Sequence, residues 1–283
     1  MFIDYHVHTE YSDDSVYPME AVVTDAIRMG MQEICFTDHV DYGIKRDWDD
    51  PRGILYRRGG PGIPGSVLLA NVDYPKYVRQ IGELQQKYRK EITIRLGLEF
   101  GIQKHRIEQY RKLYSRYSYD FIILSIHQSG DKEFWTQDFQ QGRTQQEYNE
   151  AYYEEMLSVI RNYHDYSVLG HMDLITRYDK AGLYPFENVQ PLVTEILKTV
   201  IAEGKGIEIN TSSHRYGLSD LTPSRDILRL YRDLGGKIVT IGSDSHKPKQ
   251  LGTYIEESKE ELRKLGFTQF CTYEKMVPIF HAL

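Results

Sequence analysis

Phe2-Ile3-Asp4-Tyr5-His6-Val7-His8, at the start of the chain, is an apolar-leaning run that ends in a His-x-His pair. A second run near the other end, Lys237-Ile238-Val239-Thr240-Ile241-Gly242-Ser243-Asp244-Ser245-His246, ends in Asp-x-His. Because side chains alternate across a strand, residues two positions apart point to the same side. We therefore expect two strands whose C-terminal ends offer imidazole and carboxylate groups to one metal ion or to two adjacent ions.

Short strand-like runs alternate with longer helical runs along the rest of the chain. The predicted strands are 2–8, 33–37, 92–98, 120–126, 166–170, 206–210 and 237–242. The predicted helices are 18–30, 72–90, one ending near 117, 144–162, 187–203, 222–234 and one with a short strand within 256–283. This alternation is typical of a parallel α/β sheet or barrel. We find no internal repeat and no linker, so we predict one domain over 1–283 with a loop insertion at about 43–70.

Residues of the kinds that bind metals stand at or just past the ends of these predicted strands. They are His6, His8, His39, Glu99, His127, His171, Asp244 and His246. Each alone has an ordinary explanation as a core histidine, a helix cap or a buried carboxylate, but a (β/α) barrel builds its active site at these strand ends. Imidazoles and carboxylates without a thiolate suit zinc, iron or manganese. So many ligands indicate two or three ions, with Glu99 as the best candidate for a bridge.

The composition argues against several other classes of protein. The chain has 283 residues, 40% of them hydrophobic and 27% charged, as in an ordinary soluble globular protein. A net charge of −6 disfavours nucleic acid as a partner. No apolar run approaches the ~18 residues of a membrane span, and no signal-like segment opens the chain. Cys35 and Cys271 are far apart, so we expect a reducing, cytoplasmic setting. The oligomeric state stays open.

Six motifs together resemble the polymerase and histidinol phosphatase (PHP) family. They are His6-x-His8, Thr37-Asp38-His39, Gly97-Leu98-Glu99, Ser125-Ile126-His127, Gly170-His171-x-Asp173 and Ser243-Asp244-x-His246. The stretches 170–179 and 208–212 further resemble the stand-alone histidinol-phosphate phosphatases of that family. The resemblance implies a distorted, TIM-like (β/α)7 barrel with a trinuclear metal site at the C-terminal ends of its strands.

The resemblance also implies which residues hold each ion. The first ion would take His6, His8, Glu99 and Asp244, and the second would take Glu99, His127 and His171. The third would take His39, His246 and a residue from the loop after His8. Many relatives have a histidine there, whereas this chain has Asp13-Asp14; we choose Asp14, with Asp13 as the alternative. The predicted catalytic residues are Asp244, His246 and Glu99.

The activity implied by the resemblance is that of a phosphoric monoester hydrolase. The substrate would be L-histidinol phosphate, cleaved in histidine biosynthesis by a hydroxide that bridges the metal ions. Three divalent ions, three carboxylates and a hydroxide leave a charge of about +2, which matches a phosphate monoester dianion. Arg177 and Arg215 are predicted to bind the phosphate, although a surface salt bridge is an equal alternative for each, and His214 is predicted to contact the substrate.

Two other functions stay open at this point. The protein could be a PHP-type phosphoesterase for phosphotyrosine, a nucleotide or another small ester, or a non-catalytic metal-binding PHP module. The insertion at about 43–70 could cap the mouth of the barrel as a lid, because long loops of this kind are often functional. It could equally be a solvated surface loop.

Overall fold

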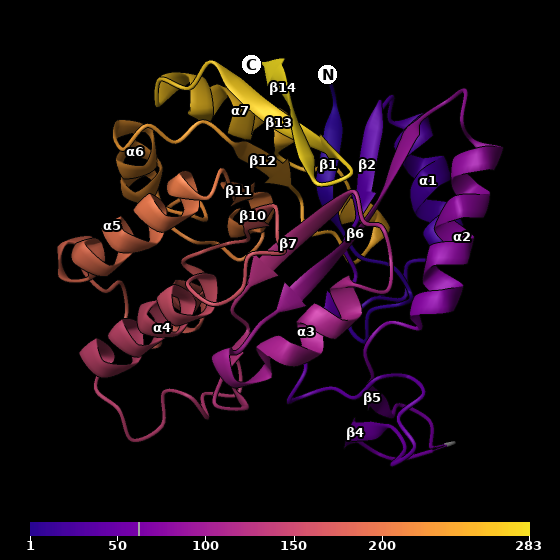
Figure 1. Ribbon diagram of the computed structural model, residues 1–283, viewed down its shortest axis with the longest axis horizontal. Coiled ribbons are helices and arrows are strands. Elements are labelled where there is room, and N and C mark those ends of the chain that lie inside the picture. Colours follow the sequence, from indigo (N-terminus) through magenta and orange to yellow (C-terminus); the bar gives the residue numbers. More distant parts are fainter. Residues whose placement is uncertain (62) are drawn as a thin grey trace.

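A curved sheet of parallel strands forms the centre of the computed structural model, which describes residues 1–61 and 63–283 (Figure 1). Its strands follow the order β1 (Ile3–Val7), β2 (Glu33–Phe36), β6 (Thr93–Gly101), β7 (Phe121–Ser125), β10 (Val168–Leu169), β11 (Gly206–Asn210) and β12 (Val239–Gly242). The short β3 (His39–Val40) pairs with β6 beyond the end of β2. A parallel bridge between Val7 and Ser245 joins β1 to the segment after β12. The result is a nearly closed seven-stranded barrel, which confirms the predicted fold class.

Helices cover the outside of this barrel (Figure 1). They are α1 (Met19–Arg28), α2 (Tyr74–Lys87), α3 (Ile107–Tyr114), α4 (Gln145–Ile160), α5 (Phe186–Ala202), α6 (Arg225–Asp233) and α7 (Ile255–Lys264). In α2 the buried residues Tyr77, Ile81 and Leu84 share one face at helical spacing. Within the part of the chain that the structure describes, no helix has both the length and the apolar character needed to cross a bilayer.

Short 3-10 turns and small hairpins complete the chain between these elements. The turns are η1 (Lys104–Arg106), η2 (Leu174–Tyr178), η3 (Thr211–Ser213) and η4 (Pro248–Gln250). Strands β8 (Gln128–Ser129) and β9 (Lys132–Glu133) form a small antiparallel hairpin just after β7. This hairpin therefore stands at the C-terminal mouth of the barrel.

Two predicted features change in the structure. β6 continues to Gly101, so Glu99 lies inside a strand rather than at its end, because β3 and β7 both pair with that extension. The insertion contains an antiparallel hairpin of β4 (Leu55–Arg58) and β5 (Val67–Leu69), which lies apart from the sheet at the lower right of Figure 1. Residue 62 of the predicted insertion lies outside the described residues.

The C-terminal segment forms a hairpin where the sequence indicated one short strand. Its strands are β13 (Gln269–Glu274) and β14 (Val277–Ala282). The hydroxyl of Tyr5 donates to the Tyr273 carbonyl at 3.1 Å and accepts the Tyr273 N–H at 2.8 Å, so the hairpin is fixed beside β1. Both chain ends lie near each other at the top of Figure 1.

Two glycines let side chains that carry chemistry come close to a neighbouring strand. A Cβ at Gly242 on β12 would overlap His6 on β1. A Cβ at Gly101 on β6 would overlap the Asp41 carboxylate and lie 2.7 Å from His127 Nδ1. Glycine is therefore required at both positions, because no side chain fits between the strand and the facing group.

Candidate metal centre

Glu99 stands at the centre of the predicted ligands. Its carboxylate oxygens lie within 3.6 Å of five imidazoles. The nearest nitrogens are His39 Nδ1 and His171 Nε2, each at 2.8 Å, and His127 Nε2 at 3.1 Å. These side chains come from segments that are far apart in sequence and meet only because the parallel strands end at one mouth. Glu99 is thus the carboxylate that all five imidazoles approach, and it belongs to two of the groups that could hold an ion.

Around Glu99 the other predicted ligands form overlapping groups. His6, His8 and Asp244 offer atoms close enough to hold one ion, and His39, Glu99 and His127 offer another such set. His6, Glu99 and His171 form a third set, and His8, His39 and His246 a fourth. Because the sets share members, the ligands surround a continuous space rather than separate sites.

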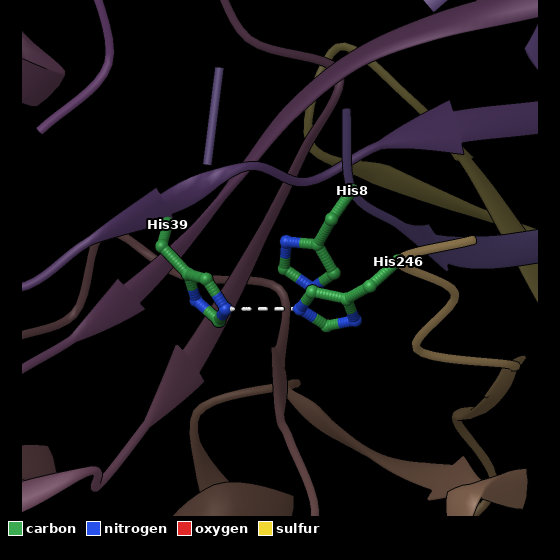
Figure 2. A group of neighbouring side chains, drawn as sticks. All are labelled: His8, His39 and His246. Carbon is green, nitrogen blue, oxygen red and sulfur yellow. Dashed lines mark hydrogen bonds between the residues drawn. The ribbon is translucent and has the colours of Figure 1, made fainter. Parts of the chain in front are cut away.

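Figure 2 shows that the imidazoles of His8, His39 and His246 lie close together. His39 Nε2 and His246 Nε2 face each other at 3.4 Å, and the ring of His8 stacks on both rings at centroid distances of 4.1 Å. Asp14 Oδ2 lies 3.2 Å from His246 Nε2 and 3.6 Å from His39 Nε2. Asp14, and not Asp13, is therefore the carboxylate that lies beside this group.

Buried ligand atoms test whether a metal fits here. Among the described residues, His6 Nε2, His8 Nε2, His39 Nδ1 and Glu99 Oε2 are buried without a hydrogen-bond partner. These atoms crowd around one space, with His39 Nδ1 at 2.8 Å and His6 Nε2 at 3.2 Å from Glu99 Oε2, whereas buried polar atoms ordinarily have well-formed hydrogen bonds. Imidazole nitrogens and carboxylate oxygens are the atoms that divalent transition metals bind. The residues therefore fit a centre for divalent metal ions.

Charges within the centre compensate one another when no cation is bound. Burial favours the neutral form of Glu99, but His6, His127 and His39 hold the pKa of its carboxyl well below the ordinary value. Burial opposes a charge on His127 as well, yet Glu99 and Asp41 raise the pKa of that imidazole to about 9. The carboxylate and the imidazoles around it therefore favour opposite charges in one another. Divalent ions would supply that positive charge in place of protons.

Two buried carboxylates that the sequence analysis missed orient the ligand imidazoles. Glu208 Oε1 lies 2.5 Å from His6 Nδ1, and its other oxygen accepts the backbone N–H of His171 at 3.0 Å. Asp41 Oδ1 lies 2.7 Å from His127 Nδ1. A carboxylate on one ring nitrogen turns the other nitrogen towards the metal and makes it a stronger ligand. An acid inside the apolar run 206–210 was the signal that could have identified Glu208.

The loop after β12 is held from two sides. Asp4 accepts the backbone N–H of Ser243 at 2.8 Å, and Arg215 donates to the carbonyl oxygens of Ser243 at 2.7 Å and Asp244 at 2.5 Å. Asp244 has a φ of 55°, a left-handed conformation that a non-glycine residue keeps only where its surroundings enforce it. Arg215 thus stabilises the position of Asp244.

A cavity of about 240 Å³ opens above the metal ligands. Its outer wall consists of basic, aromatic and aliphatic side chains: Lys45, Arg57, Trp135, Leu174, Arg177, Tyr178 and Tyr216. Lys45 and Arg57 come from the insertion, which therefore borders the mouth of the barrel. Arg57 also pairs with Glu133 in β9, so the insertion contacts the barrel at that point.

The three predicted substrate-binding residues occupy different positions. Arg177 lines the cavity, where its Nη2 donates to Ser212 Oγ at 2.6 Å and its guanidinium lies 4.0 Å from the ring of Tyr216. Arg215 is turned to the backbone after β12. His214 is exposed and stacks on Tyr254 at 4.2 Å. The roles of Arg215 and His214 in substrate binding stay predictions.

A Gly101→Ala substitution tests the support of His127. We expect the added methyl group to displace Asp41 from His127 Nδ1 and to weaken metal binding by about 10- to 100-fold, the usual effect of losing such a partner. Chelator competition on the purified protein measures this. Gly82→Ala in α2 is the control, because a Cβ there meets nothing within 4 Å. Equal affinities in the two variants would refute the role given to the Asp41 contact.

Parallel-barrel architecture and clustered ligands at its mouth define a barrel metalloprotein. Residues 4–212 match the PHP domain family, and the chain belongs to this family. It is 30% identical over 279 residues to the histidinol-phosphatase of Lactococcus lactis, covering 97% of this chain and 95% of that protein. It is 24% identical over 277 residues to the histidinol-phosphatase of Bacillus subtilis, covering 89% of this chain and 96% of that protein.

Solved structures agree with this assignment. The crystal structure of the Lactococcus lactis histidinol phosphate phosphatase, in complex with zinc, L-histidinol and phosphate, superimposes with a TM-score of 0.81. It is 29% identical to this chain, and the match covers 98% of each. A histidinol phosphatase structure from Listeria monocytogenes, described as putative, has a TM-score of 0.70 at 20% identity and shows the shared fold.

Proposed function

We propose that this protein is a metal-dependent phosphomonoesterase that hydrolyses L-histidinol phosphate to L-histidinol and phosphate in histidine biosynthesis. The observation that carries the proposal is the ligand cluster around Glu99 beneath a cavity that Arg177 lines. Likeness over 98% of the chain to a phosphatase with L-histidinol and phosphate bound supports this substrate. The reaction belongs to metal-assisted ester hydrolysis.

The proposed centre holds two or three divalent ions, and the zinc in the related structure favours zinc over iron or manganese. The ions would be held by His6, His8, Glu99 and Asp244; by Glu99, His127 and His171; and by Asp14, His39 and His246. When bound, they would activate the attacking water and neutralise charge on the phosphate oxygens. Of the ligands that line the cavity, Asp244, His246 and Glu99 are proposed to be catalytic.

The two ends of the substrate have different partners in the cavity. Arg177 is fixed by Ser212 and Tyr216 with its guanidinium at the cavity wall, where it can donate two hydrogen bonds to a phosphate. Trp135 and Tyr178, with ring centroids 6.2 Å apart, form an aromatic part of the wall that suits an imidazole ring. The substrate would therefore lie with its phosphate over the metal centre and its ring toward the mouth.

Replacing the two arginines should separate phosphate binding from support of the metal centre. Arg177→Met is expected to lower kcat/KM by about 10²-fold, as loss of one group that stabilises transition-state charge does, with metal content unchanged. Arg215→Met is expected to lower metal content as well, because Asp244 loses the donor on its carbonyl. Steady-state kinetics and metal analysis of both variants measure this. Identical metal loss in both would contradict the separate roles.

A panel of phosphate esters tests the substrate. The zinc-, manganese- and iron-loaded enzymes would each receive L-histidinol phosphate, phosphotyrosine and a nucleoside monophosphate. We expect the highest kcat/KM for L-histidinol phosphate. Equal or faster turnover of another ester would favour the broader phosphoesterase reading. Metal binding without hydrolysis of any ester would identify a non-catalytic PHP module.

Two further predictions accompany this function. Cys35 and Cys271 are both free and buried, in keeping with the reducing, cytoplasmic setting predicted from the sequence. The net charge of −6 continues to favour a small phosphorylated molecule over nucleic acid as the partner. The oligomeric state is left open.

A further inference from the structure

Lys45 is a buried cation that the proposed reaction does not use. Its side chain is 7% exposed, and its Nζ lies 2.5 Å from Asp13 Oδ1 and 2.8 Å from Asp41 Oδ2. Neither carboxylate belongs to the ligand groups of the metal centre. A lysine is rarely buried to this degree unless it is paired, so these two contacts explain its position.

Each of the two carboxylates leads to a different part of the metal centre. Asp13 immediately precedes Asp14, whose carboxylate approaches His39 and His246. Asp41 holds Nδ1 of His127. One ammonium group therefore connects the loop that carries Asp14 with the support of a ligand from another group.

Few contacts of its own fix the position of the Asp14 side chain. Its side chain is 54% exposed, and across residues 1–61 and 63–283 its carboxylate has no hydrogen-bond or ion-pair partner besides the imidazoles of His39 and His246. The loop is fixed on either side, by Ser12 Oγ donating to Asp38 at 2.6 Å and by Ser15 Oγ donating to the His246 carbonyl at 3.0 Å. Between these anchors, Asp13 is turned to Lys45, whereas Asp14 is turned to the imidazoles.

The backbone that carries Lys45 is itself rigid. Lys45 N donates to the Asp41 carbonyl at 2.8 Å, which closes a turn. Next to it, Arg46 N donates to the Leu69 carbonyl at 3.1 Å, and Asn71 N donates to the Arg46 carbonyl at 2.7 Å. The base of the insertion is thus tied together and presents Lys45 from a fixed position.

We propose that Lys45 is a positioning residue: by binding Asp13 it selects Asp14 as the carboxylate ligand beside His39 and His246, and it thereby sets the metal affinity of that group. The proposal rests on the ligand groups given for the proposed function. Without the ammonium, two adjacent carboxylates would compete for the same space beside the imidazoles, and neither would be held in advance. Pre-positioned ligands bind a metal more tightly because less ordering accompanies binding.

Zinc titration of the metal-free protein against a competing chelator tests this, with no substrate present. Asp13→Asn, which keeps the shape of the side chain and removes only this contact, is expected to weaken the binding of one zinc ion by about tenfold or more, with the other ions within threefold of wild type. Lys45→Met is expected to weaken the same ion and, because Asp41 also loses the ammonium group, to weaken the ion beside His127 by a smaller factor. In the double variant, the loss at the first ion is expected to be no larger than in the single variants. Lys112→Met, at an exposed position in α3, is the matched control.

Repeating the titration in an Asp14→Asn variant tests whether the affected ion is the one held by Asp14, His39 and His246. There the ligand itself is lost, so Asp13→Asn is expected to have no additional effect on zinc affinity. Unchanged affinities in Lys45→Met and Asp13→Asn, a uniform loss over all ions, or a further loss in the Asp14→Asn background would each overturn the proposal. Should Lys45→Met fail to fold, Asp13→Asn still tests the same contact. A wild type that binds zinc but hydrolyses no ester would refute the proposed function and leave this result intact.

Discussion

Glu99→Gln is expected to lower kcat/KM for L-histidinol phosphate by about 10³-fold or more and to reduce the number of metal ions bound. The carboxylate lies within 3.6 Å of His6, His8, His39, His127 and His171, so an amide there removes the one negative charge that these imidazoles share. Removing one partner from a buried set of charges typically costs about 3–5 kcal/mol, because the remaining charges stay buried without compensation. An amide is also a poor ligand for zinc.

Metal analysis and steady-state kinetics on the purified variant measure this effect. Glu33→Gln is the matched control, because Glu33 is also a buried glutamate on the barrel, paired with Arg95 at 2.8 Å and remote from the ligand set. That variant should lose stability but keep its metal ions and its kcat. A Glu99→Gln enzyme with a full metal complement and near-normal turnover would show that Glu99 is not a shared ligand.

The sequence predicted the barrel and the candidate ligands that the structure brings together, because both follow from local patterns. Apolar runs that end in a histidine or an acid identify strand ends, and in a parallel barrel all such ends meet. His127 and His171 could be placed in this way without knowledge of which strands are neighbours. The structure differs at Glu99, which lies inside β6, because the strand gains two more residues of pairing from β3 and β7.

The residues that orient the ligands could not be predicted in the same way. Asp41 supports His127 across 86 positions of sequence, and Glu208 supports His6 across 202. Such pairs depend on strand order and register, which no local pattern specifies. The choice between Asp13 and Asp14 is of the same kind, since the two are neighbours in sequence and Lys45, 32 positions from Asp13, distinguishes them. From the sequence, the insertion could be a lid or a solvated loop. In the structure, its first residues include Lys45, whose ammonium group contacts Asp13 and Asp41.

Removal of the metal ions is expected to abolish hydrolysis and to lower the melting temperature by roughly 10 °C or more. A ligand that binds only the folded protein stabilises it by about 4 kcal/mol at a concentration a thousand times its Kd. For a chain of this size each kcal/mol corresponds to about 2 °C, and more than one ion contributes. The crowded ligand atoms of His6, His8, His39 and Glu99 are the structural source of this stabilisation, because they lack well-formed hydrogen bonds and an ion would give them a shared partner.

Calorimetry of the metal-loaded protein, of the chelator-treated protein and of the same sample after zinc is added back measures the effect. The added zinc should restore both the melting temperature and the activity, which separates metal loss from irreversible damage. In Glu99→Gln the shift between loaded and treated samples should shrink, because the ions bind less tightly when their shared ligand is gone. If chelation left the wild-type melting temperature unchanged while removing the ions, the buried ligand cluster would have to be satisfied by protons alone. The metal centre would then serve the reaction without contributing to the stability of the barrel.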